Sequence, residues 1–205
     1  MFAQARLTSI FSVFTAARPL RHRVVALLLS ASCCFSAQVF AGHPGVFKLE
    51  DAHSWRAEGS EYLNAQFSIE LSSGAREAVQ NGVPLVLELQ VQVVETHTWW
   101  WDAVEIEITE RRSLQYHALS QSYQVKDLSS GTQGNYSRLE DALRAAGVIE
   151  NLLLTDQALD KGPRYSLRIR GSLDIESLPT PVRLIAYVSS EWDMVSKWYK
   201  WPLVR

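Results

Sequence analysis

Strict two-residue alternation of apolar and polar side chains in residues 83–112 constrains this chain more than any other feature. In the first arm the apolar residues share one parity: Val83, Leu85, Leu87, Leu89, Val91 and Val93. A second arm repeats the pattern with Val104, Ile106 and Ile108. A period of two is typical of a half-buried β-strand. The stretch therefore predicts a long antiparallel hairpin with a tryptophan-rich tip.

The same alternation recurs elsewhere in the chain. It is clear in residues 62–72 and again in residues 164–176. Residues 178–205 open with two prolines and are expected to hold two more short strands. The pattern slips by one residue near Ala118, which an alternating strand absorbs only with a bulge or a break.

One substantial helix is predicted within residues 137–147. Ser137 and Glu140 have the spacing of a capping box, and Gly147 follows the last apolar position, where it would end the helix. A shorter helix of one or two turns is expected between Ser73 and Gly82. Six or more alternating strands and one substantial helix predict a mostly β fold, an immunoglobulin-like antiparallel β-sandwich with one crossover helix.

Residues 1–41 have the organisation of a signal peptide. Four arginines precede an uncharged apolar run, VVALLLSASCCFSAQVFA, and the small residues Val39 and Ala41 predict cleavage after Ala41. Residues 42–205 are then expected to form a single β-sandwich domain, exported and without a membrane span. The alternative is an uncleaved N-terminal segment that anchors the protein in the membrane.

The chain after residue 41 is acidic and has no cysteine. Four of the 20 lysines and arginines lie in residues 1–41, so 16 remain against 22 acidic residues, a formal net charge of −6. Nucleic acid is therefore not expected as a partner, and neither is an anionic membrane. Cys33 and Cys34 both lie in the predicted leader, which leaves no thiolate nucleophile and no cysteine metal ligand in the mature chain.

The tip of the predicted hairpin offers the clearest candidate binding residues: His97, Trp99, Trp100 and Trp101. Tryptophan gives a large contact area at low entropic cost, so the cluster could bind a sugar, a lipid or a peptide. Alternate tryptophans could equally cap one end of the sandwich core.

Two basic groups lie nearer the C-terminus. Arg164, Arg168 and Arg170 share one strand face and could bind a phosphate or a carboxylate. A charge-balanced face, with Glu105 and Glu107 as cross-strand partners, is the alternative. A second segment mixes aromatic and basic residues, as at a membrane interface, a nucleobase site or a final strand with one buried face: Lys197, Trp198, Tyr199, Lys200 and Trp201.

Residues that could carry catalysis are few. The histidines His43, His53, His97 and His117 show no HxH or HxxxH spacing, so no metal site is predicted. The sequence has no GxSxG elbow and no glycine-rich phosphate loop. We therefore expect a protein that is not an enzyme and needs no cofactor.

Several blocks occur in a characteristic order: AREAVQNGVPLVLEL, LQYHALSQSYQV, LEDAL, LRIRGSLDI followed by LPTPVRL, and SEWDMVSKWYKWPL. Together they resemble a family of exported Gram-negative proteins known as domain of unknown function 4390. The family has no assigned activity, so no catalytic or binding residue is carried over. The resemblance implies a periplasmic envelope protein, often encoded beside a sensor histidine kinase of the nitrogen-regulation type.

These observations lead to two hypotheses. The first is a non-enzymatic protein-binding module of the cell envelope, with an envelope protein, such as a sensor kinase, as its partner. The second is a small-ligand binding protein that holds a lipid or glycan at Trp99, Trp100 and Trp101.

Overall fold

A computed structural model describes residues 43–96, 102–156 and 164–203. All of these belong to one unit, Gly42–Arg205. The predicted signal peptide, residues 1–41, lies outside the described residues, and so do His97, Trp99, Trp100 and Trp101.

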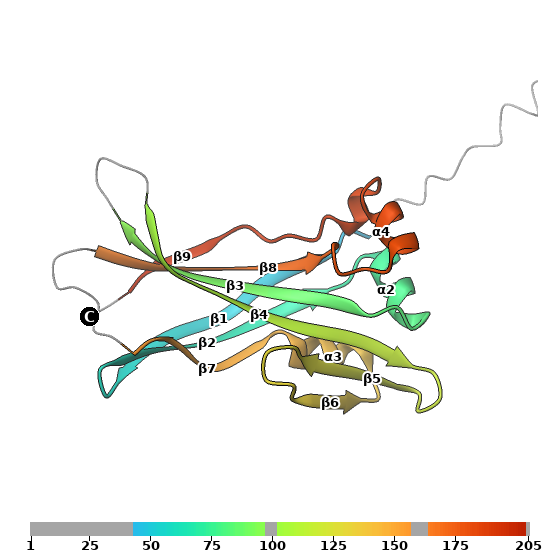
Figure 1. The fold of residues 1–205 in the computed structure, drawn as a ribbon, viewed down its shortest axis with the longest axis horizontal. Helices are drawn as coiled ribbons and strands as arrows, with labels where there is room; N and C mark the ends of the chain where they lie inside the picture. The colour runs from blue at the N-terminus through green and yellow to red at the C-terminus, as the bar shows by residue number, and fades with distance from the viewer. Residues whose placement is uncertain (1–42, 97–101, 157–163, 204–205) are drawn as a thin grey trace, which may run out of the picture. The chain divides into compact units, whose positions relative to one another are not determined.

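Two antiparallel sheets make up the described domain (Figure 1). The small sheet has the order β1-β2-β7, with β1 (Val46–Ala57), β2 (Ser60–Glu70) and β7 (Val148–Thr155). The large sheet has the order β6-β5-β4-β3-β8-β9, with β6 (Gln133–Tyr136), β5 (Ser122–Asp127), β4 (Ala103–His117), β3 (Leu85–Thr96), β8 (Arg164–Asp174) and β9 (Tyr199–Pro202). The predicted mostly β, antiparallel two-sheet fold is confirmed.

Two helices connect the sheets. α2 (Ser73–Gln80) leads from β2 to β3, and α3 (Leu139–Ala146) leads from β6 to β7. Both were expected from the sequence, and α3 is the predicted crossover helix. The predicted capping box at its start is wrong: Arg138 is the N-cap residue and makes no side-chain capping bond, so Ser137 lies one position too early.

The C-terminal region departs from the expected pair of short strands. It contains α4 (Thr180–Ala186), a single turn of 3-10 helix, η1 (Ser190–Trp192), and then β9. Pro179 is the N-cap residue of α4, and Pro181 lies in its first turn, where proline is favoured because its missing N–H has no intrahelical partner. α2 and α4 lie at the same end of the sandwich (Figure 1).

The predicted hairpin is β3 paired with β4, from Leu85 opposite Leu114 to Glu95 opposite Ala103. Its inward residues are at most 1% exposed: Leu85, Leu87, Leu89, Val91 and Val93. The register shifts between Val93 and Val94. This irregularity breaks the alternation of β4, so Val104, expected to face the core, is 45% exposed.

The two sheets approach each other closely where β1 meets β8. Gly171 lies on the inner face of β8, opposite Leu89. A side chain at Gly171 would overlap the ring of Phe47 from β1, which is 3% exposed. The glycine therefore makes the space in which the small sheet packs on the large one.

Candidate functional site

Helix α4 presents apolar side chains to solvent. Leu184, Ile185, Tyr187 and Val188 are 63%, 59%, 55% and 86% exposed, whereas Ala186 is the buried residue of the helix. Leu184 and Ile185 belong to α4, Tyr187 is its C-cap residue, and Val188 lies in the turn that follows. Isolated apolar residues are common on protein surfaces, but a contiguous group marks an interaction site. These four residues, with Val195 (50% exposed), are called the α4 patch below.

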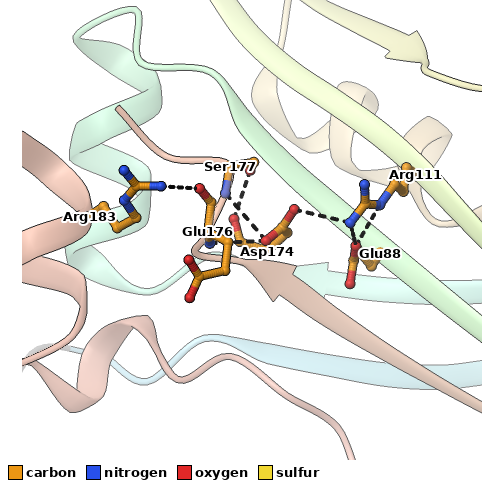
Figure 2. A network of polar contacts seen from close by, with 6 residues as sticks. All are labelled: Glu88, Arg111, Asp174, Glu176, Ser177 and Arg183. Atoms are coloured by element: carbon orange, nitrogen blue, oxygen red, sulfur yellow. Dashed lines mark hydrogen bonds and ion pairs between the residues drawn. The ribbon is translucent and has the colours of Figure 1, made fainter. Parts of the chain in front are cut away.

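Polar contacts, more than apolar burial, hold α4 in place (Figure 2). The side chain of Arg183 donates to the carbonyl oxygen of Glu176 at 2.7 Å, and the Tyr187 hydroxyl donates to the Glu176 carboxylate at 2.5 Å. The Asp174 carboxylate accepts the N–H groups of Glu176 and Ser177 at 3.0 and 3.3 Å. A helix fixed in this way keeps its apolar side chains available for another surface.

Arg111 of β4 anchors the turn between β8 and α4 to the large sheet. Its Nε and Nη2 atoms lie 2.7 and 2.6 Å from one oxygen of Glu88, and Nη2 lies 3.5 Å from Asp174 (Figure 2). The hydrogen bond that Arg111 donates to Glu88, and then the negative charge of Glu88, raise the pKa of Arg111 above the ordinary value. The hydrogen bond to Glu176 likewise raises the pKa of Tyr187. Both groups therefore keep their protons throughout the physiological pH range.

A cavity of about 410 Å³ adjoins the α4 patch. Its lining includes Tyr187, Val188 and Val195 of the patch, together with Leu173, Ile175 and Trp192. Trp192 and Met194 are 5% and 1% exposed, so the segment after α4 is anchored in the core. Ser189, Ser190 and Asp193 also line the cavity, so the recess is mixed in polarity. A recess beside exposed apolar side chains is an arrangement in which interface hot spots form.

The C-terminal aromatic and basic segment forms the predicted final strand. Tyr199 and Trp201 of β9 pack against the core, and Lys200 is exposed and forms an ion pair with Asp102. The ring of Trp198 lies over the guanidinium groups of Arg168 and Arg170.

The arginines of β8 do share one face, as expected, but their expected partners are wrong. β3 lies between β8 and β4, so Glu105 and Glu107 cannot pair directly across strands with Arg168 or Arg170. Glutamine side chains of β3 take that place.

Another cavity, of about 580 Å³, lies between the β5–β6 hairpin and the start of β7. Its one arginine, Arg112, is 13% exposed and donates to the carbonyl oxygens of Val148 and, at 3.1 Å, of Ala146. The same guanidinium lies 3.7 Å from the Asp127 carboxylate. Arg112 therefore links β4 to the α3–β7 junction, and its hydrogen bonds and its ion pair stabilise the fold.

The described residues contain no group of three or more His, Cys, Asp or Glu side chains that could hold a metal ion. In the same parts of the chain no helix is long and apolar enough to cross a membrane. The four predicted binding residues at the hairpin tip lie outside this description.

Sequence reasoning missed the α4 patch, because the run VRLIAYV is rich in β-branched residues and reads as a strand. The signal that could have revealed the helix is the pair of prolines just before it.

Comparison with known proteins gives one result. The family model described as a domain of unknown function (DUF4390) matches residues 46–202, which is more than half of the chain. No curated protein and no solved structure matches the chain.

Proposed function

We propose that this chain, which belongs to the DUF4390 family, is a non-enzymatic module of the cell envelope that binds another protein through the α4 patch. Export by cleavage of the signal peptide after Ala41 is part of the proposal, and so is a periplasmic location. A sensor histidine kinase is the candidate partner that the family resemblance suggests. The observation that carries the proposal is the exposure of apolar side chains on a helix that polar contacts hold in place.

The energetics favour a protein over a small ligand at this site. Burial of one Leu, Ile or Val side chain stabilises a complex by about 1.5–3 kcal/mol. Association costs about 4–15 kcal/mol, so the patch and the adjoining cavity must be part of a wider interface. A lipid or glycan carrier that uses Trp99, Trp100 and Trp101 is the alternative, but it rests on residues that the structure does not describe.

The test is a double substitution of the patch, Leu184→Glu with Val188→Glu. Both side chains are exposed, so the free energy of unfolding should change by no more than about 0.5 kcal/mol for each. Burial of two charges in an apolar interface should weaken partner binding at least about tenfold. The measurement is quantitative co-purification of envelope proteins with the tagged chain, together with thermal unfolding.

The matched control is Leu119→Glu, because Leu119 is fully exposed in the turn between β4 and β5. It makes the same chemical change away from the patch and should leave the co-purified partner unchanged. Retention of the same partner by the double variant, at wild-type yield, would exclude the α4 patch as the binding surface.

A further inference from the structure

Two arginines of β8 stack on one tryptophan on the outer face of the large sheet. The guanidinium carbons of Arg168 and Arg170 lie 4.8 and 4.5 Å from the centroid of the Trp198 ring. Alternate residues of a strand share a face and are about 7 Å apart. One indole ring therefore contacts two positive charges that lie close together.

Two glutamines of the neighbouring strand, β3, each accept a hydrogen bond from the Nε atom of one of the arginines. The Nε atom of Arg168 donates to Gln92, and that of Arg170 donates to Gln90, each at 2.6 Å. Gln92 is 7% exposed although it lies on the outer face. The two guanidinium groups are therefore fixed in position, at little further cost in side-chain entropy when a ligand binds.

Arg168 and Arg170 are half-buried, and in the part of the chain that the structure describes only their Nε atoms donate hydrogen bonds to another side chain. Among residues 43–96, 102–156 and 164–203, no carboxylate forms an ion pair with Arg168 or Arg170. The contact with Trp198 is a cation–π contact, which uses none of the N–H groups of the two arginines as hydrogen-bond donors. Both guanidinium groups contact one ring, so their like charges repel each other, and bound anions would relieve that repulsion. The fork of N–H donors fits a carboxylate with two parallel hydrogen bonds.

We propose that Arg168, Arg170 and Trp198 form a receptor for an acidic, extended peptide segment of a partner protein, with one carboxylate on each guanidinium. Alternate residues of an extended peptide have the same backbone spacing, about 7 Å, as Arg168 and Arg170 have along β8. An anionic lipid surface would also cover Glu107, two strands from Arg168 on the same face, whereas a single peptide that lies along β8 need not do so. This receptor is separate from the α4 patch and goes beyond the proposed function.

The test uses purified full-length protein and two labelled peptides, one of alternating glutamate and serine, the other with glutamine in place of glutamate. Fluorescence anisotropy should show saturable binding of the glutamate peptide, and none of the glutamine peptide. Arg168→Gln with Arg170→Gln should weaken this binding at least about tenfold. Arg164→Gln, the same change at an exposed arginine of the same strand face, should alter it less than about twofold.

A second double variant distinguishes loss of binding from loss of folding. Arg168→Lys with Arg170→Lys keeps both charges but loses the fork, and it should weaken binding about threefold. The proposal is overturned if the glutamate peptide does not bind saturably to the wild-type protein. It is also overturned if the protein with Arg168→Gln and Arg170→Gln folds and binds the glutamate peptide as tightly as wild type does. Binding of inorganic phosphate or of anionic phospholipid vesicles, without binding of the peptide, would equally overturn it.

Discussion

At the scale of single residues, Asp127 fixes the turn between β5 and β6. One oxygen of its carboxylate accepts the N–H groups of Ser129 and Ser130, each at 2.8 Å. Burial alone would raise the pKa of Asp127, but the hydrogen bonds from Ser130 and Ser129 and the charge of Arg112 together lower it. The ionised carboxylate is thus stabilised in the folded state.

This lowered pKa predicts a pH-dependent effect of Asp127→Asn. The carboxylate stabilises the fold fully above its unfolded-state pKa of about 3.9, and this contribution is lost as the pH falls through the lower folded-state pKa. The variant should lose about 1 kcal/mol of unfolding free energy at neutral pH, as measured by urea denaturation. The difference from wild type should shrink as the pH falls through the folded-state pKa and should vanish below it. A difference that stays constant with pH would contradict this account, and Glu105→Gln, an exposed change, serves as the control.

At the scale of elements, α4 depends on Arg111. The Arg111 side chain is 52% exposed, so its ion pairs with Glu88 and Asp174 contribute little to global stability. They do fix the turn from which α4 starts. We expect Arg111→Gln to speed amide hydrogen exchange in α4 several-fold, while exchange in the core of β8 stays unchanged. Arg164→Gln should change neither, and equal acceleration in both elements would instead indicate general destabilisation.

Strands were predictable from this sequence where alternation continues without interruption. β2, β3 and β8 follow it because each has one face in the core, and the slip near Ala118 is the turn between β4 and β5. Val104 was misplaced because the register shift near Val93 has no local sequence mark.

The candidate sites depend on tertiary structure, and this limited their prediction. The exposure of Leu184 and Val188 follows from what α4 packs against, which periodicity does not reveal. The stacking of Trp198 on Arg168 and Arg170 requires β9 to pair with β8, residues some thirty positions apart in sequence. The sequence identified Trp198 and the two arginines as candidate binding residues, but it could not show that they contact one another.

At the scale of the whole molecule, the described domain presents two candidate binding surfaces. The α4 patch is apolar and lies at the end of the sandwich that α2 shares (Figure 1). The receptor formed by Arg168, Arg170 and Trp198 lies on the outer face of the large sheet. A protein that works by such surfaces should be insensitive to loss of its histidines and sensitive to charges placed in the patch.

Site-specific photocrosslinking in living cells tests the central claim most directly. A photoreactive amino acid at Val188 should give one discrete adduct with another protein, because Val188 is 86% exposed within the patch. The same amino acid at Leu119, which is also fully exposed, should give no such adduct. Absence of an adduct from Val188, or an identical adduct from Leu119, would contradict the account.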